Sequence, residues 1–552
     1  MKQKHLEGGA GGFWESRIDD LEPHVGGAGE KSRHRLILWA LAAFFVLRVL
    51  RWAMADLWYD EILSLQYFVF GRTLPEIFRD YSIANNHFLC NAVERIYVLV
   101  SFFFYPVHRN ELLLRLPSIA FGCLTVVTIG ACWRKWLGRK LSLIVALLMV
   151  ASPVFSGFAY QMRGYSLAMF LATVSVTLAI SRRDNPTFGN ALWLFAVSAM
   201  LPLVMPTAVV VPMALSIAFL LPVVQRGSGA RFLDAVRRAL PTILGGILGL
   251  SYYLTLWAQF MANRRTSGGW ESRPLVFLHL ALAFGCHLGI LLLPAIRRRR
   301  FGDRFALCLA YGSTAVILLF LVLPTAVGRA PFPRVFLPLL PLYTLAAALS
   351  FKANLADSGL GRLTMKKLAF WAVAPGILLG IGGDILTGIE MDYASEPPQN
   401  LLQSYYRGSS DVSAWTRLIA SRIDGADSWR CGITGGWPQA HPEVFLNFVG
   451  LPKANWLLVD PYDSTAFNYY SRLMPRITTY RNLEAPVLSQ KALDTWLGTY
   501  FKQGLSIYYL ARNEKSLRSA MEFVGLAPDD FKIWESERYR HRVLYRLTPI
   551  AK

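Results

Sequence analysis

LILWALAAFFVLRVLRWAMADLWYDE, residues 36–61, joins a long apolar segment to two adjacent carboxylates, Asp60 and Glu61. The apolar part, about residues 36–54, is long enough to cross a bilayer as a helix, and the basic residues 33–35 before it favour a cytoplasmic start. The two carboxylates then fall just beyond the outer edge of the lipid, where charged groups are costly unless they are solvated, paired or used. This stretch predicts a polytopic membrane protein whose first outer loop carries an acidic pair.

The composition also favours an integral membrane protein. The chain has 552 residues, is 54% hydrophobic, contains 16 Trp and has a mean hydropathy of +0.35. A net charge of +21 would indicate nucleic-acid binding in a soluble protein, but here the basic residues cluster in short loops between apolar segments, as the positive-inside rule expects. We therefore expect the lipid bilayer, and no nucleic acid, as a partner. The six cysteines are scattered, with only Cys431 in the polar C-terminal region, and indicate no disulfide framework there.

The orientation of the spans depends on one apolar segment, residues 88–106. It carries Asn91, Glu94 and Arg95, which a lipid-spanning helix tolerates poorly, so we interpret it as an amphipathic helix in the outer interface. With this segment left out, about eleven spans remain, and the basic loops between them become cytoplasmic. The predicted spans are about residues 36–54, 112–133, 141–158, 166–180, 191–205, 208–224, 242–260, 276–296, 305–327, 335–351 and 368–386.

Three regions follow from this topology. Residues 1–33 are polar, lack an apolar signal-peptide core, and are expected to form a cytoplasmic tail. Residues 34–387 form the transmembrane domain, with the first outer loop at 55–111. Residues 388–552 have no twenty-residue apolar run and predict a small outward-facing α/β domain, with strands at 456–459, 506–509 and 543–547 and a helix at 514–523. Its role is open between acceptor recognition and stabilisation of the outer loops.

The outer face of this topology collects acids and arginines. Arginine matches phosphate oxygens bidentately and keeps its charge, and a carboxylate within hydrogen-bond reach can take a proton from an attacking hydroxyl. Each arginine alone is more typical of an anchor for phospholipid phosphate. Taken together, the residues indicate a site for an anionic lipid head group beside a proton acceptor. The set comprises Asp60, Glu61, His87, Arg115, Arg163, Arg264, Arg265, Arg329 and Arg334.

Other site patterns are missing from the sequence. It contains no P-loop, no HExxH and no cysteine-based zinc spacing. It also shows no internal repeat and no matched pair of Gly/Pro-broken spans, which would be typical of a secondary transporter.

Short motifs follow one another between residues 58 and 165. They are Trp58-Tyr59-Asp60-Glu61 with Ser64, Asn86-His87-Phe88, Glu111 with Arg115-Leu116-Pro117-Ser118, Gly138-Arg139, Ser152-Pro153, and Gln161-Met162-Arg163-Gly164-Tyr165. In this order and spacing they resemble the GT-C glycosyltransferases of the protein O-mannosyltransferase and lipid A aminoarabinose transferase type. The resemblance covers about residues 35–180. It is loose beyond them, where Arg334 with Leu337-Pro338-Leu339-Leu340-Pro341 forms one further similar segment.

The resemblance implies a GT-C fold with an outward acidic pair beside the acceptor and a polyprenyl-monophosphate sugar as donor. Carried over to this sequence, Asp60 is expected to be the catalytic base and Glu61 its partner, which orients the acceptor or the loop. Arg115 would bind the donor phosphate, with Arg163 and Arg334 as weaker candidates for the same work. Tyr59, His87 and Tyr165 complete the expected substrate-binding set. Many members carry His-Pro-Pro or Lys-Pro-Pro where this chain has Asn86-His87-Phe88, so the pre-shaped proline turn is absent.

The implied reaction is a single inverting displacement, in which an acceptor hydroxyl attacks the sugar and polyprenyl phosphate leaves. No cofactor is required and no metal site is predicted, although Asp60, Glu61 and His87 could supply ligands to a divalent metal. The acceptor, a lipid, glycan or protein, and the sugar stay open. The expected location is a bacterial inner membrane, with the C-terminal domain in the periplasm. The alternatives are a glycan ligase or polymerase using a lipid-diphosphate donor, a glycolipid transporter or flippase with the acids as coupling groups, and a purely structural assembly protein.

Overall fold

The computed structural model describes the chain in parts. These are residues 28–54, 57, 59–83, 86–102, 110–224, 229–266, 303–322 and 333–356, scattered residues within 274–292, and 429–433, 455–459, 477–479, 507–511, 514–523, 527–539 and 542–550. The predicted span at 368–386 and the predicted boundary at residue 388 therefore lie outside the described residues.

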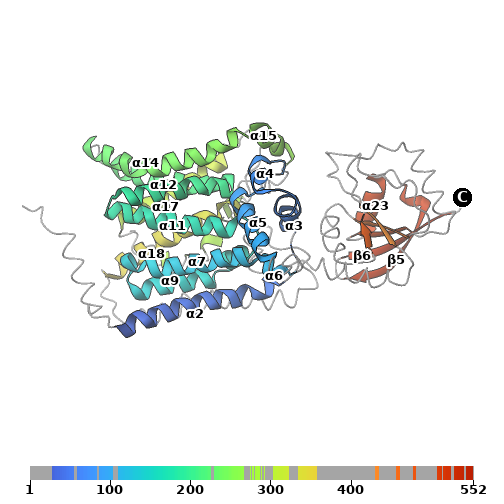
Figure 1. Ribbon diagram of the computed structural model, residues 1–552, viewed down its shortest axis with the longest axis horizontal. Coiled ribbons are helices and arrows are strands. Elements are labelled where there is room, and N and C mark those ends of the chain that lie inside the picture. Colours follow the sequence, from blue (N-terminus) through green and yellow to red (C-terminus); the bar gives the residue numbers. More distant parts are fainter. Residues whose placement is uncertain are drawn as a thin grey trace, which may run out of the picture.

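A bundle of long apolar helices forms most of the described structure, and Figure 1 shows these helices side by side. Within the described residues, four helical stretches are long and apolar enough to cross a membrane, and a pair bent by 65°, Arg139–Ala151 and Pro153–Ala159, would make a fifth. The long helices are α2 (Ala28–Ala53), α7 (Leu116–Cys132), α9 (Arg139–Ala151), α11 (Tyr165–Asp184), α12 (Phe188–Val204), α13 (Val210–Val224), α14 (Gly229–Ser251), α17 (Arg304–Val322) and α18 (Leu340–Ala356). The chain is a polytopic helical membrane protein, as expected, and the total of eleven spans stays a prediction.

Small residues allow some of these helices to pack closely. A Cβ atom on Gly249 of α14 would collide with the backbone carbonyl of Ala199 in α12, and one on Gly312 of α17 would collide with that of Ala214 in α13. Glycine at these two positions therefore permits backbone-to-backbone contact, as is common between helices in membranes. Helices α12, α13, α14 and α17 therefore pack against one another as one group.

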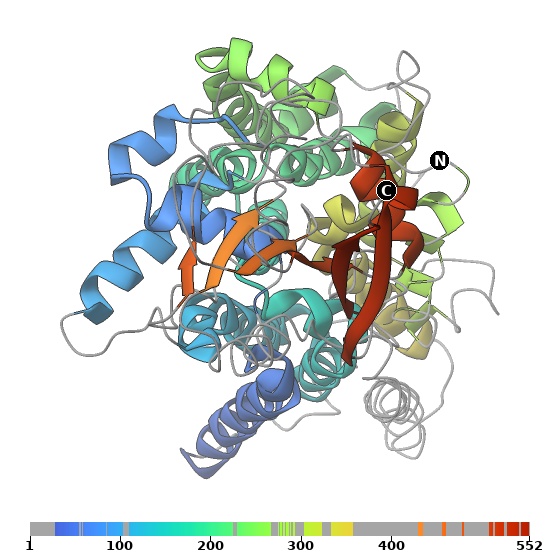
Figure 2. The ribbon, with the colours of Figure 1, turned by 90° about the vertical axis from the view of Figure 1, so that its right-hand side faces the viewer.

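Further helices, most of them short, gather at one end of the bundle (Figure 1). They are α3 (Tyr59–Ser64), the π-helix η1 (Leu65–Val69), α4 (Leu74–Arg79), α5 (Phe88–Phe102) and α6 (Glu111–Leu114). Figure 2 looks onto this end and shows the same segments across the ends of the long helices. The segment that we interpreted as interfacial is thus a helix of 15 residues with buried Asn91 and Glu94, and it is not among the candidate spans.

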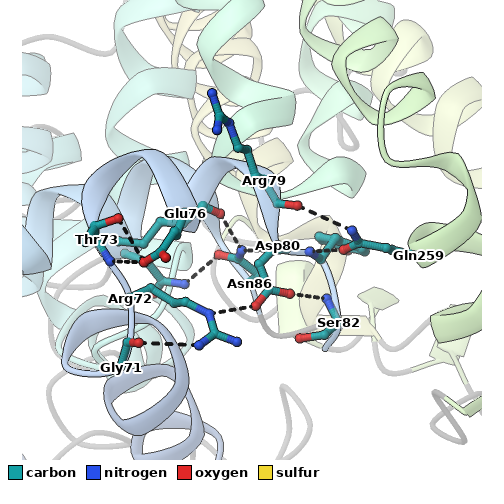
Figure 3. Close-up of polar contacts among 12 residues, drawn as sticks. Gly71, Arg72, Thr73, Glu76, Arg79, Asp80, Ser82, Asn86 and Gln259 are labelled. Carbon is teal, nitrogen blue, oxygen red and sulfur yellow. Dashed lines mark hydrogen bonds and ion pairs between the residues drawn. The ribbon is translucent and has the colours of Figure 1, made fainter.

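Helix α4 is fastened to the distant helix α15 (Trp257–Thr266), as Figure 3 shows. The side-chain oxygen of Gln259 accepts a hydrogen bond from the backbone N–H of Tyr81, and its amide nitrogen donates to the carbonyl of Arg79 at 3.3 Å. Below this contact, the rings of Tyr81, Phe88, Tyr253 and Phe260 pack against one another. The first loop after α2 is therefore held in place by hydrogen bonds to Gln259 and by ring contacts with Tyr253 and Phe260.

The described C-terminal strands form one six-stranded sheet, coloured orange to red in Figure 2, in the order β3-β1-β2-β4-β6-β5. Strands β1 to β4 pair in parallel, and β6 pairs antiparallel with both β4 and β5. The strands that the sequence predicts are present as β2 (Asn455–Val459), β4 (Ile507–Ala511) and β6 (Arg542–Pro549), as is helix α23 (Glu514–Phe523). The sequence analysis missed β1 (Trp429–Ile433), β3 (Ile477–Thr479) and β5 (Phe531–Tyr539).

Candidate active site

Asp60 lies in the first turn of α3 and faces two arginines from distant parts of the chain. Its Oδ2 is 2.9 Å from Nη1 of Arg163, in the turn between α10 (Pro153–Ala159) and α11, and 3.9 Å from Nη2 of Arg334, in the 3₁₀ helix η6 (Pro333–Leu339). The carboxylate is 15% exposed, and the two arginine side chains are 4% and 11% exposed. One carboxylate beside two guanidinium groups leaves a net positive charge, which favours an anionic ligand.

Glu61, the next residue, is fully buried and has a different environment. Its two oxygens accept hydrogen bonds from Nε and Nη2 of Arg115 at 3.0 and 2.6 Å, and Oε1 also accepts one from the backbone N–H of Met162 at 2.7 Å. The third nitrogen of Arg115, Nη1, donates to the carbonyls of Trp52 and Ala53 at 3.2 and 3.1 Å. This ion pair thus ties the end of α2, the start of α3 and the turn before α11 together.

The geometry separates the roles that we expected for Arg115 and Glu61. All three nitrogens of the Arg115 guanidinium are engaged within the protein, and the side chain is 2% exposed, so its arrangement suits positioning better than binding of a donor phosphate. The ring of Tyr160, 5.4 Å from the guanidinium carbon, also packs against it. For Glu61, the observed contacts suit the expected orientation of the loop.

His87 lies between the acidic pair and the broken end of α12. Helix α12 ends at Val204, Met205 has an extended backbone and Pro206 follows, so the Val204 carbonyl has lost its helical partner. Nδ1 of His87 contacts this carbonyl at 3.2 Å, and the hydroxyl of Tyr253 donates to the Pro202 carbonyl at 2.9 Å. Burial, together with the nearby Arg163 guanidinium, lowers the pKa of His87 to about 3.

Asn86 replaces the proline turn that the sequence lacks. Its side-chain amide donates to the carbonyls of Ile77, at 2.8 Å, and of Asp80, and its oxygen accepts from the side-chain amide of Asn91 at 2.9 Å. Figure 3 shows Asn86 beside Asp80, which is itself paired with Arg72 at 3.0 Å. Side-chain hydrogen bonds therefore hold the backbone before His87 in place.

Tyr165, the first residue of α11, supports Arg163. Its ring lies 5.1 Å from the guanidinium carbon and packs edge-on against Phe158 at 5.4 Å between ring centroids. The ring of His87 is 6.4 Å from that of Tyr165. The structure thus brings Asp60, Glu61, His87, Arg115, Arg163, Tyr165 and Arg334 into one region, whereas the side chains of Tyr59, Arg264, Arg265 and Arg329 lie outside its description.

Sequence reasoning missed Glu94 as part of this region. The carboxyl group of Glu94, on α5, is 1% exposed, and its Oε2 has no hydrogen-bond partner among the described residues. Burial raises its pKa well above the usual value, and the charge of Glu61 adds to the effect. The signal in the sequence was an acid within an apolar helix, which we used only to argue against a membrane span.

The described side chains bring together no group of three or more His, Cys, Asp and Glu residues that could hold a metal ion. The two carboxylates that we considered as possible ligands each face arginine instead. This region therefore has the chemistry of a site for an anionic ligand.

Comparison with known proteins identifies the fold. No protein-family model and no curated protein matches the chain. Among solved structures, the GT-C protein ArnT from Cupriavidus metallidurans bound to undecaprenyl phosphate is similar over 93% of this chain and 97% of its own, with 14% sequence identity and a TM-score of 0.50. ArnT in the apo state is similar over 94% of this chain and 98% of its own, with 13% sequence identity and a TM-score of 0.49. AglB from Archaeoglobus fulgidus, in complex with an inhibitory peptide and a dolichol-phosphate, is similar over 94% of this chain and 74% of its own, with 12% sequence identity and a TM-score of 0.43.

The likeness to ArnT extends over nearly the whole length of both chains, although at this identity it concerns the fold alone. The motifs between residues 58 and 165 led to the same expectation from the sequence. The chain therefore has the GT-C fold.

Proposed function

We propose that the protein is a membrane-embedded glycosyltransferase that moves a sugar from a polyprenyl-monophosphate carrier to an acceptor hydroxyl. The observation that carries the proposal is the partly exposed Asp60 carboxylate between Arg163 and Arg334. It combines a proton acceptor with two phosphate-binding groups in one site. The ArnT structure of the same fold contains undecaprenyl phosphate, which makes a polyprenyl phosphate the first ligand class to test.

Asp60 is the better base of the acidic pair because it is accessible. Its side chain is 15% exposed, against 1% for Glu61, whose oxygens are already occupied by Arg115 and by the Met162 N–H. A general base must come within hydrogen-bond reach of the proton that it removes. Glu61 instead fixes the helix turn on which Asp60 sits.

The proposed step is a single displacement at the anomeric carbon. The acceptor hydroxyl gives its proton to Asp60, its oxygen forms the new glycosidic bond, and the bond between the anomeric carbon and the phosphate oxygen breaks, so the configuration inverts. The electron pair of that bond leaves with polyprenyl phosphate. Arg163 and Arg334 would stabilise this negative charge, since fixed guanidinium groups need little reorganisation during the reaction.

The location follows from the same argument. A lipid-phosphate donor makes the outer face of a bacterial inner membrane the proposed place of transfer, with the N-terminus in the cytoplasm and the C-terminal domain in the periplasm. Acceptors in this setting are lipids, glycans or proteins of the cell envelope.

The test is transfer by the purified protein in nanodiscs. Wild type is incubated with mannosyl-, glucosyl- and aminoarabinosyl-undecaprenyl phosphate and extracted envelope acceptors, in parallel with Asp60→Asn and with Asp80→Asn as a matched control. Asp80 lies in the same loop, and its carboxylate pairs with Arg72 and not with an arginine of the site. We expect turnover by wild type and Asp80→Asn, and a loss of at least 100-fold in folded Asp60→Asn.

Other outcomes would point to the alternatives. Transfer from lipid-diphosphate donors alone would indicate a ligase or polymerase. Movement of a fluorescent glycolipid across proteoliposomes without transfer would indicate a flippase. Full activity of Asp60→Asn would refute the assignment of the base.

A further inference from the structure

The imidazole of His87 is held in a single tautomer. The Val204 carbonyl can only accept a hydrogen bond, so the ring nitrogen that contacts it at 3.2 Å, Nδ1, carries the proton. Nε2 then has a lone pair and can only accept. This atom is buried, the residue is 5% exposed, and Nε2 has no hydrogen-bond partner among the described residues.

The surroundings fix the position of the ring. A Cβ atom on Gly164 would lie 3.2 Å from Nδ1 and 3.0 Å from a methyl carbon of Val204, so glycine allows the turn before α11 to approach closely. The ring of Tyr165 lies on the same turn. A buried acceptor left without a partner is energetically costly, and native structures retain few such atoms without a reason.

The charges around His87 define the ligand that it suits. Arg163, Asp60 and Arg334 all interact electrostatically with the ring. Burial and the two guanidinium groups disfavour the imidazolium form, so His87 stays neutral and cannot serve as a cation for phosphate. A neutral acceptor beside a phosphate-binding pair suits a hydroxyl or amine N–H on the group attached to that phosphate.

We propose that Nε2 of His87 accepts a hydrogen bond from a hydroxyl or amine of the transferred sugar, while Arg163 and Arg334 bind the phosphate. The inference rests on the proposed function and deepens it. It makes His87 a determinant of donor specificity, because a site with a buried acceptor rejects a ligand that leaves it unpaired. Carrier phosphate without a sugar makes no use of this atom.

Two reciprocal substitutions test the proposal. His87→Asn can keep an N–H near the Nδ1 position, and thus the bond to Val204, but has no atom at the position of Nε2. His87→Gln can place an amide oxygen near Nε2 and loses the Nδ1 donor. Tyr253→Phe is the matched control, because it removes a side-chain hydrogen bond to Pro202 at the same broken helix end.

The measurement is binding of undecaprenyl phosphate and of its mannosyl, glucosyl and aminoarabinosyl forms to full-length protein in nanodiscs. We expect His87→Asn to bind undecaprenyl phosphate within twofold of wild type and the preferred glycosylated form about tenfold more weakly. His87→Gln and Tyr253→Phe should keep the preference for the glycosylated form and lose thermal stability instead. In transfer assays, His87→Asn should raise the KM for the donor more than it lowers kcat.

Failure of the inference is distinct from failure of the proposed function. Equal weakening of both ligands in His87→Asn, or no weakening of either, would overturn the role of Nε2 while leaving the transferase intact. If His87→Asn does not fold, loss of the preference in folded His87→Gln would overturn it equally. Wild type that binds neither undecaprenyl phosphate nor any glycosylated form would refute the proposed function, and the inference with it.

Discussion

Arg115 forms a buried bidentate salt bridge with Glu61, in which Nε lies 3.0 Å from Oε1 and Nη2 lies 2.6 Å from Oε2. The two residues are 54 positions apart, and the pair fixes the turn that presents Asp60 to Arg163. A buried pair of this kind is weak evidence for net stabilisation, but removal of one partner leaves an uncompensated buried charge. Of the two acids, Glu61 is thus buried against Arg115, and Asp60 is the more exposed one, facing Arg163 and Arg334.

The first prediction concerns this pair. Arg115→Lys should destabilise the protein by about 1–3 kcal/mol, because an ammonium group keeps the charge but cannot reproduce the planar fork or reach the Trp52 and Ala53 carbonyls as well. Thermal unfolding in detergent measures the loss, with Arg72→Lys on the exposed pair with Asp80 as control. Unchanged stability together with a lost affinity for undecaprenyl phosphate would instead indicate that Arg115 binds the donor phosphate.

The second prediction is a pH dependence due to His87. Its pKa is about 3 in the folded protein, below the ordinary value of about 6.5, so the unfolded chain binds a proton that the folded chain does not bind. The contribution of the neutral His87 ring to the stability of the folded protein is fully present above about pH 6.5 and is lost progressively as the pH falls toward 3. We expect the melting temperature of His87→Asn to fall less steeply than that of wild type between pH 7 and 5. Parallel profiles would show that folding does not lower the pKa of His87.

The third prediction has the opposite sign and concerns Glu94. Its raised pKa means that the folded protein keeps a proton that the unfolded chain releases, so stability declines as the pH rises above the ordinary range for a glutamate. Glu94→Gln resembles the neutral acid, and its advantage over wild type in melting temperature should grow from pH 5 to pH 8. Glu76 is the control, because hydrogen bonds from the backbone and side chain of Thr73 lower its pKa. Glu76→Gln should therefore show no advantage that grows with pH.

The sequence predicted the helical membrane class, three of the six described C-terminal strands and the residues that gather at the site, because hydropathy and short motifs are local properties. It did not reveal the partners. Arg334 is far from Asp60 in sequence, and only the three-dimensional structure shows that the two side chains lie 3.9 Å apart. Likewise, Arg115 belongs to a recognisable motif, but its burial against Glu61 and two carbonyls depends on how α2 ends. The edge strand β3 has only three residues, too few for a pattern of alternation to appear.

The last prediction separates the two arginines that face Asp60. If they stabilise the leaving phosphate, Arg163→Gln and Arg334→Gln should each lower kcat by about 100-fold or more, since removal of one donor to a developing anion has effects of this order. Arg163 is the closer and more buried of the two, at 2.9 Å against 3.9 Å, and stacks on Tyr165, so its loss should also lower the melting temperature. Arg334 is 3.9 Å from Asp60 and its side chain is 11% exposed, so Arg334→Gln should lower the melting temperature less than Arg163→Gln, which makes it the cleaner test of catalysis. Arg72→Gln, at an exposed arginine of the loop that follows α3 and η1, serves as control for both. Arg334→Gln with normal kcat would mean that Arg334 does not stabilise the leaving phosphate.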